Sequence, residues 1–400
     1  MLPAQVVEVK SQPRRPSRCA DPPQSDDTHR PARGAPLPAL TTSARTTERE
    51  TLSVAFVVPL QGPTGLYGPS CLACGDLAVE ELNADRGIAG RQVDLVVVDG
   101  GRDPDVVAAE VGHLVDTGAV DAVAGWHISA VRQAITRRIG GRVVYAYAAM
   151  HEGRDDTPGL FMLGERPVNQ LLPATRWIHE QLGVGRWAVV GNDYVFPRVT
   201  GATTRAALQD GPSRIVSETY VPLGTTNFTP VLDDLRQGDV DGVIMLLMGD
   251  DAIHFNRQFA RTGLADQVTR LSPAVEENTL LGGGADAHQN LYAAAAYFDH
   301  MDTVEGHDFS RAYYRRYGAW APALNAIGES CYEAIRFLAW LGDRHGSIDL
   351  ATVSATEPGR FYDSPRGLVR LDGNLLDQDV YLASADALEF TIREQITRTS

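Results

Sequence analysis

Hydrophobic positions follow two alternating periods from Leu52 onward. Short continuous apolar runs, typical of buried strands, alternate with segments in which apolar residues recur at helical spacing. The expected strands are residues 52–58, 93–98, 121–124, 142–147, 187–190, 214–220 and 243–247. The expected helices are residues 70–83, 104–115, 129–139, 168–182, 199–208, 228–236 and 251–262. Because the strands lack polar alternation and helices separate them, the pattern predicts an α/β fold with parallel sheets covered on both faces.

The segment after residue 50 is too long for one comfortable core. About 340 residues exceed what a single hydrophobic core usually supports, so two Rossmann-like lobes are expected. No Pro/Ser-rich linker separates them, which predicts a hinge with about three crossovers, near residues 161–167, 289–297 and 359–367. The expected lobes are 51–165 plus 292–360, and 166–291 plus 361–395. Since ligands of open α/β sheets bind beyond the carboxyl ends of the strands, two facing lobes predict a hinged cleft.

Residues 1–50 have a different composition. They hold eight of the 23 prolines and show no apolar periodicity. Such a segment buries too little surface to offset its ordering entropy, so a disordered Pro/Arg-rich tail is predicted. No apolar run reaches the length of a signal peptide or a membrane span. As written, the sequence predicts a cytoplasmic protein, whereas a start upstream of Met1 would allow a periplasmic one.

Charge and composition exclude several classes of function. The chain has 36 basic against 51 acidic residues and a net charge of -15, which disfavours nucleic-acid binding. Its single lysine, Lys10, lies in the tail, so the folded part has no P-loop or Schiff-base lysine. The four cysteines lack zinc spacing, and neither a metal nor another cofactor is expected. Because hydrolase, zinc-protease and dinucleotide-binding motifs are also missing, the chain is predicted not to be an enzyme.

Several loop segments carry a family resemblance. The chain resembles type I periplasmic solute-binding proteins, the leucine/isoleucine/valine-binding kind, in residues 59–68 (PLQGPTGLYG), 77–83 (LAVEELN) and 87–91 (GIAGR). It is similar to the urea and short-chain amide branch, which includes amide-sensing regulators, in residues 191–198 (GNDYVFPR), 220–224 (YVPLG) and 248–251 (MGDD). The resemblance covers residues 52–395 and implies a two-lobed cleft without catalysis.

The resemblance also implies positions in the cleft. Ser129 matches the family's ligand-binding serine, and its place at a helix start suits a ligand oxygen. A plain helix cap is the alternative. Tyr147 and Tyr194 match pocket tyrosines of the two lobes, and Tyr67 matches a rim tyrosine. Each could instead be a core aromatic residue.

Three further positions follow strands of the second lobe. Gly249 and Asp250 come after one strand, and Glu276 comes after the next. A carboxylate there could accept a hydrogen bond from an amide NH2 or an ammonium group. A solvated loop acid is the commoner outcome.

The sequence also departs from the family. Ala149 stands where the amide sensors carry a threonine, and Trp126-His127 replaces their aromatic residue before the serine. His127 could be a ligand contact or a structural loop histidine. Ala274 stands where amino-acid receptors place a glutamate, which disfavours an amino-acid ligand.

Together these features predict a protein that closes on a small molecule. The ligand is expected to be a small neutral solute of the urea or short-chain amide type, and the partner an ABC transporter permease. A cytoplasmic sensor of amides acting on a regulatory protein is the alternative, followed by a branched-chain amino acid receptor. The oligomeric state is not readable from the sequence.

Overall fold

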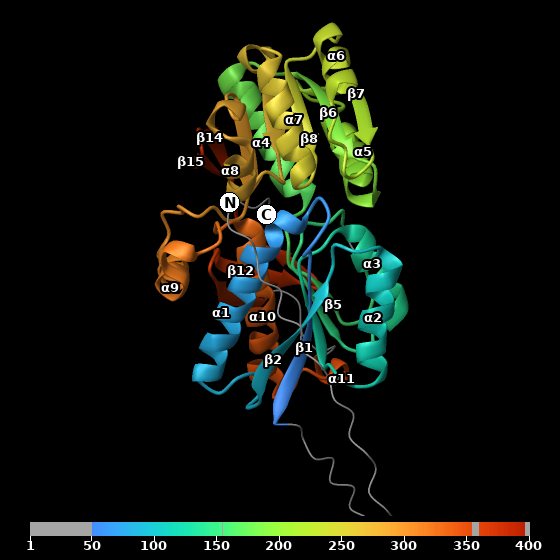
Figure 1. The fold of residues 1–400 in the computed structure, drawn as a ribbon, viewed down its shortest axis with the longest axis vertical. Helices are drawn as coiled ribbons and strands as arrows, with labels where there is room; N and C mark the ends of the chain where they lie inside the picture. Colours follow the sequence, from blue (N-terminus) through green and yellow to red (C-terminus); the bar gives the residue numbers. More distant parts are fainter. Residues whose placement is uncertain (1–49, 154, 354–359, 397–400) are drawn as a thin grey trace, which may run out of the picture. The chain divides into compact units, whose positions relative to one another are not determined.

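Two mostly parallel sheets organise the structure, a computed structural model that describes residues 50–153, 155–353 and 360–396 (Figure 1). The strand order is β11-β12-β13-β5-β4-β3-β1-β2 in the first sheet and β15-β14-β10-β9-β8-β6-β7 in the second. The first sheet contains β1 (Thr51–Val58), β2 (Gln92–Asp99), β3 (Ala122–Gly125), β4 (Val144–Tyr147), β5 (Leu160–Met162), β11 (Arg360–Ser364), β12 (Gly367–Asp372) and β13 (Leu375–Asp377). The second contains β6 (Arg186–Asn192), β7 (Arg214–Val221), β8 (Gly242–Leu246), β9 (Thr269–Ser272), β10 (Leu291–Ala295), β14 (Val380–Asp386) and β15 (Glu389–Ile396).

Helices separate most of these strands along the chain. They are α1 (Gly68–Ala84), α2 (Pro104–Asp116), α3 (Ser129–Ile139), α4 (Pro167–Leu182), α5 (Val195–Leu208), α6 (Thr229–Gln237), α7 (Asp250–Arg261), α8 (Glu277–Gly283), α9 (Val304–Tyr317), α10 (Ala326–His345) and α11 (Leu350–Val353). Short 3-10 turns are η1 (Gly65–Tyr67), η2 (Leu264–Asp266), η3 (Ala285–Ala287) and η4 (Gly318–Trp320). Within the described residues, no helix is both long and apolar enough to span a membrane.

The parallel α/β prediction is confirmed. Strands β1 to β5 pair in parallel, as do β6 to β10. The C-terminal strands add antiparallel pairs, β11–β12 and β12–β13 in the first sheet and β10–β14 and β14–β15 in the second. Helices α1 and α10 pack together in the first lobe, as do α2 and α3. In the second lobe, α6, α7 and α8 contribute to one buried cluster, while α4 and α5 contribute to another. Each sheet is therefore a middle layer between helices.

Local sequence explains where the helices begin and end. The Asp103 carboxylate accepts hydrogen bonds from the first backbone N–H groups of α2, and Pro104 occupies a position that needs no donor. Asn325 caps α10 in the same way, by accepting from Gly328 N at 2.8 Å. Helix α3 ends at Gly140, whose φ of 56° suits glycine.

The chain crosses between the two sheets three times, and the third crossing differs from the prediction. The first, between β5 and α4, lies within the predicted residues 161–167. The second follows β10, because residues 291–295 pair within the second sheet. The third lies at Gln378 and Asp379 rather than at 359–367, because β13 pairs in parallel with β5 and keeps residues 360–377 in the first lobe. The predicted tail lies, apart from Glu50, outside the described residues.

Buried side chains bind the three crossings to one another. Gln378 Nε2 donates to Leu163 O at 3.1 Å, which joins the third crossing to the first. The Glu165 carboxylate accepts from Ala296 N at 2.8 Å, which joins the first crossing to the second. Arg366 donates to Gln378 Oε1 at 2.6 Å and so anchors this hinge to the first lobe. The three segments therefore form one hydrogen-bonded hinge.

Candidate functional site

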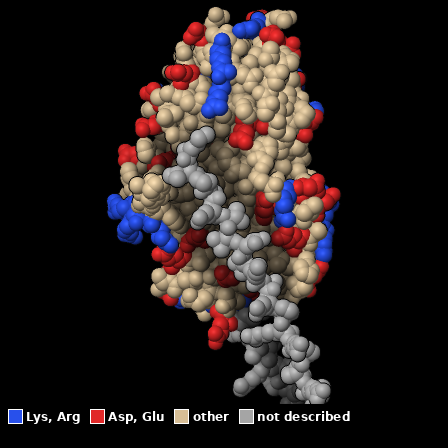
Figure 2. All heavy atoms as spheres, in the orientation of Figure 1, with Lys and Arg blue, Asp and Glu red and all other residues tan. Residues whose placement is uncertain are grey.

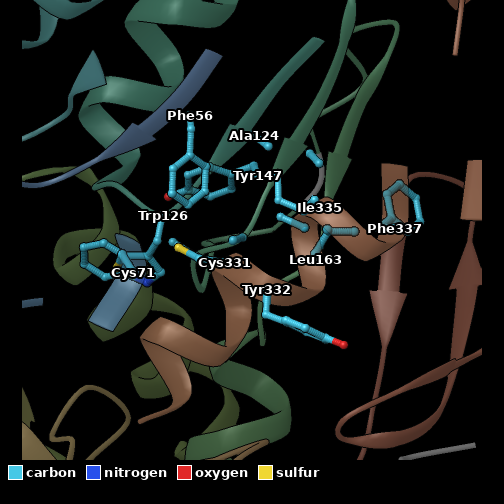
Figure 3. Packing of buried hydrophobic residues seen from close by; sticks show 14 of the residues in the cluster. Phe56, Cys71, Ala124, Trp126, Tyr147, Leu163, Cys331, Tyr332, Ile335 and Phe337 are labelled. Atoms are coloured by element: carbon cyan, nitrogen blue, oxygen red, sulfur yellow. The ribbon is translucent and has the colours of Figure 1, made fainter. Parts of the chain in front are cut away.

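A small buried cavity lies where the strand ends of the two lobes meet. Its volume is about 10 Å³, roughly the room of one water molecule. Six predicted site residues line it, together with four apolar ones: Trp126, His127, Ser129, Tyr147, Ala149 and Tyr194, with Ile128, Met150, Phe196 and Met248. Figure 3 shows Trp126 and Tyr147 within the surrounding buried core. The remaining predicted residues, Tyr67, Gly249, Asp250 and Glu276, do not line this cavity.

The His127 side chain forms its hydrogen bonds within its own lobe. Its Nδ1 lies 3.1 Å from Val57 O, which can only accept, so Nδ1 carries the proton and Nε2 accepts from the Tyr145 hydroxyl. Burial lowers the pKa of His127 to about 4, so the ring is neutral at physiological pH. Both ring nitrogens thus have partners within the first lobe, as expected for a structural loop histidine.

Ser129 and Tyr147 bring two hydroxyl groups to the cavity. Ser129 opens α3, and its Oγ donates to Glu152 Oε2 at 2.8 Å. The Tyr147 hydroxyl at the end of β4 donates to His127 O at 2.9 Å. The two oxygens lie 3.5 Å apart. Because Glu152 and His127 O are nearer acceptors than the other hydroxyl, we assign the two hydrogens to them, which leaves both oxygens with lone pairs for a further donor.

Glu152 and Arg132 form a buried ion pair behind these hydroxyls, which the sequence interpretation missed. Arg132 Nη2 donates to Glu152 Oε1 at 2.8 Å, and the two side chains are 3% and 12% exposed. The guanidinium also lies over the Tyr147 ring, 5.2 Å from its centroid. Burial opposes ionisation of Glu152, but Arg132 and the Ser129 hydrogen bond outweigh it and lower the pKa of Glu152. The carboxylate is therefore ionised and can only accept.

The second lobe closes the cavity with aromatic and apolar groups. Tyr194 precedes α5 and is half-buried, whereas Phe196 and Met248 are fully buried. Asn192, at the end of β6, holds the neighbouring loop by accepting from Met248 N at 2.9 Å. The wall from this lobe is thus mainly hydrophobic, with the tyrosine as its polar tip.

Tyr67 and Gly249 form a direct contact between the lobes. Gly249 N donates to the Tyr67 hydroxyl at 2.9 Å, and Asp250 N donates to Pro63 O at the same distance. Tyr67 in turn packs edge-on against Trp126, with ring centroids 5.3 Å apart. The Gly/Pro loop of the first lobe is therefore bonded to the start of α7.

Two predicted acids lie away from the cavity. The Asp250 side chain is exposed, and only its backbone takes part in the lobe contact. Glu276 is buried, and its Oε2 accepts from Ala326 N of the first lobe at 3.1 Å. Burial, with the neighbouring Glu277 carboxylate, raises the pKa of Glu276 well above its usual range. The structure thus places Glu276 in a second bond between the lobes.

Asp251, adjacent to a predicted residue, is the acid that organises the second lobe's loops. It is 1% exposed and accepts hydrogen bonds from Asn192 Nδ2, Gly224 N and Thr225 N at 2.6, 2.9 and 3.2 Å. These bonds tie the loops after β6 and β7 to the start of α7. Helical periodicity could have assigned it to the inner face, since Asp251 lies four residues before the buried Phe255.

Charged side chains elsewhere pair at the surface. On the face drawn in Figure 2, basic and acidic groups lie close together. Asp116, for example, bonds both Arg138 and Arg142, which holds the pKa of that carboxyl at about 2. Among the described residues, no group of three or more His, Cys, Asp or Glu side chains could hold a metal ion.

Two α/β lobes, three crossings and a cavity at the strand ends define a two-lobed ligand-binding fold. A family model described as periplasmic binding protein matches residues 51–389, and the chain belongs to that family.

Solved structures share this fold. An amino acid ABC transporter substrate-binding protein from Pseudomonas fluorescens Pf-5 is 17% identical, with a TM-score of 0.77 over 88% of this chain and 97% of its own. A solute-binding protein of an ABC transporter from Rhodopseudomonas palustris BisB5, in complex with 3,4-dihydroxybenzoic acid, is 19% identical, with a TM-score of 0.74 over 87% and 96%. The branched-chain amino acid transporter substrate-binding protein LivJ from Streptococcus pneumoniae, in complex with isoleucine, is 17% identical, with a TM-score of 0.71 over 86% and 100%.

Proposed function

We propose that this protein is the non-catalytic solute-binding component of an ABC transporter and that its cleft takes a small neutral solute with an amide N–H group, such as urea or a short-chain amide. Membership of the periplasmic binding protein family and the three neighbouring transporter proteins support the binding role. The family also supports a periplasmic place of action. The expectation of a cytoplasmic protein rested on residues 1–50, nearly all outside the described part.

One observation carries the choice of ligand class. The hydroxyl hydrogens of Ser129 and Tyr147 are used on Glu152 and His127 O, which leaves two acceptor oxygens 3.5 Å apart at the cavity. An amide or urea N–H2 supplies the missing hydrogens. The carbonyl of the same ligand suits the backbone N–H groups of Ser129 and Ala130, since those of Val131 and Arg132 already donate to Ile128 O.

The lining of the cavity agrees with this ligand class. Its space of about 10 Å³ holds a water molecule but not urea, so a bound ligand requires the lobes to lie further apart than they do in this structure. The apolar wall of Phe196, Met248 and Met150 suits a short alkyl group next to the amide. By contrast, the two ligand-bound neighbours hold a carboxylic acid and an amino acid.

Thermal unfolding with candidate ligands tests the proposal. Urea at low concentration, formamide, acetamide and propionamide are compared with acetate, isoleucine and 3,4-dihydroxybenzoate. A ligand at 100 times its dissociation constant adds about 2.7 kcal/mol to the free energy of unfolding. Stabilisation by amides and not by acids supports the proposal, and stabilisation by the acids alone contradicts it.

A paired substitution locates the site. Tyr194→Ala should fold and lose the ligand-dependent stabilisation, since Tyr194 lines the cavity from the second lobe. Tyr292→Ala is the matched control, because Tyr292 is half-buried in the same lobe and packs on Trp177 instead. An unchanged ligand shift in the Tyr194 variant would remove that residue from the site.

A further inference from the structure

Glu152 places a negative charge beside the cavity and accepts from the Ser129 hydroxyl, the donor for which a carboxylate ligand would compete. It follows β4 in the chain, and among the described residues three side chains of the first turns of α3 donate to its carboxylate. These donors are Ser129 Oγ at 2.8 Å, Arg132 Nη2 at 2.8 Å and Gln133 Nε2 at 3.3 Å. The positive end of the helix dipole also favours an anion there. The chain thus holds its own anion beside the cavity.

We infer that Glu152 is the specificity-determining residue of this site, because it occupies the hydroxyl donor of Ser129 and thereby selects neutral N–H donors over carboxylates. The inference rests on the proposed function, for which it supplies the mechanism of selection. It concerns a residue that contacts Ser129 and does not itself line the cavity.

Two physical effects produce the selection. With Glu152 ionised, Ser129 donates to it and offers a ligand only lone pairs, so a ligand carboxylate would meet oxygen without a hydrogen between them. A second carboxylate near the first also suffers like-charge repulsion, which is strong where water is excluded. An amide avoids both effects, because its N–H2 group donates and carries no charge.

Arg132 does not reverse this preference. Its charge is matched by Glu152 and by Asp155, whose Oδ2 lies 3.8 Å from Arg132 Nε. The Nε and Nη1 atoms of Arg132 are buried and have no hydrogen-bond partner among the described residues. Arg132 is not among the residues that line the cavity, so these buried donors offer a ligand anion no direct contact there.

The substitution Glu152→Gln tests the inference with matched ligand pairs. Acetamide and acetate have nearly the same shape, as do propionamide and propionate, so their affinity ratio isolates hydrogen-bond polarity and charge. In Glu152→Gln, the new amide donates to Ser129 Oγ and frees the serine hydrogen for a ligand carboxylate. The preference for amide over acid, measured by calorimetry, should fall about tenfold to hundredfold, the range for one hydrogen bond to a charged group.

Asp155→Asn is the control. It removes the same charge from beside Arg132, at 3.8 Å rather than 2.8 Å, and Asp155 makes no bond to Ser129. Its affinity ratio should stay within about threefold of the wild-type ratio, which corresponds to less than 1 kcal/mol. An equal fall in both variants would assign the effect to net charge and overturn the role of the Glu152–Ser129 bond.

A double substitution keeps the test decisive. If selection acts through Ser129, then Glu152→Gln in a Ser129→Ala background should change the ratio much less than in the wild-type background. If Glu152→Gln folds poorly, Glu152→Asp serves instead, because it keeps the charge but withdraws the carboxylate from Ser129. A wild-type ratio in that variant would overturn the inference.

The outcomes separate this inference from the proposed function. If the wild type binds amides and Glu152→Gln retains the same ratio, the proposed function stands and the inference is wrong. If the wild type binds no amide but Glu152→Gln gains affinity for the carboxylates, the amide ligand is wrong and the role of Glu152 stands.

Discussion

Gly249 provides the most direct test of how the lobes meet. Its backbone, with φ 54° and ψ -123°, lies in a region that side chains rarely adopt. A Cβ at this position would lie 2.0 Å from Pro63 O and 2.9 Å from Leu66 Cδ2, both in the first lobe. The same residue donates to Tyr67. Gly249→Ala therefore cannot keep the present contact between the lobes.

The expected cost divides into two parts. Backbone strain lowers the free energy of unfolding of the variant by about 1–3 kcal/mol, whether the lobes are together or apart. The collision with Pro63 O is relieved only by separation, which breaks the hydrogen bonds from Gly249 N and Asp250 N. Two such bonds contribute roughly 1–3 kcal/mol together. Closure should be weakened by that amount, and ligand affinity should fall roughly 5- to 150-fold.

Small-angle scattering measures how far the lobes separate, and calorimetry measures the ligand affinity. Without ligand, Gly249→Ala should have a larger radius of gyration than the wild type, and a saturating ligand should reduce the difference. Gly263→Ala is the control, since Gly263 also has a positive φ of 76° but its Cβ would meet no atom within 4 Å. That variant should lose about 1–2 kcal/mol of stability to backbone strain and keep the wild-type scattering. Wild-type scattering and affinity in Gly249→Ala would refute the argument that this contact governs closure.

Two further predictions concern buried polar groups. Burial lowers the pKa of His127 to about 4, below the 6.5 of the unfolded chain, so stability should fall as the pH drops from 6.5 to 4. Guanidinium unfolding of His127→Asn should show a shallower pH dependence, by up to about 1.4 kcal/mol per pH unit, and an unchanged slope would contradict this. Asp251→Asn should cost about 2–3 kcal/mol in guanidinium unfolding, because an amide nitrogen would face donors. Asp250→Asn should change stability and ligand affinity little, since that side chain is exposed; equal losses would contradict the assignment.

Most strands and helices between residues 51 and 261 were predictable because their apolar patterns are local, whereas the three-residue strand β5 was missed. The apolar run at 52–58 is buried throughout most of β1, and α3 begins and ends at the predicted residues. The third crossing was not predictable. Strand β12 alternates buried and exposed positions, and β13 joins β5 through Leu375 and Met162, more than two hundred positions apart. No local pattern indicates which of two sheets such a strand will join.

The candidate site shows the same division between local and distant information. Ser129 and Tyr147 lie at strand ends and helix starts, which periodicity locates well. Glu152 lies in a loop, and its bond to Ser129 depends on a path that spacing does not reveal. Asp250 and Asp251 are neighbours of identical chemistry, yet one is exposed and the other buried. Their difference follows from the rotation of α7 against the loops after β6 and β7.

The structure supports a neutral ligand for a different reason from the one that the sequence suggested. None of the predicted cleft residues is an arginine, and this was an argument against anionic ligands. The structure places Arg132 three residues after Ser129 on α3, so both side chains share one face of the helix. Alone, this buried guanidinium would favour an anion. Glu152 cancels its charge and takes the Ser129 hydrogen, so the balance at the cavity depends on one ion pair rather than on the net charge of the chain.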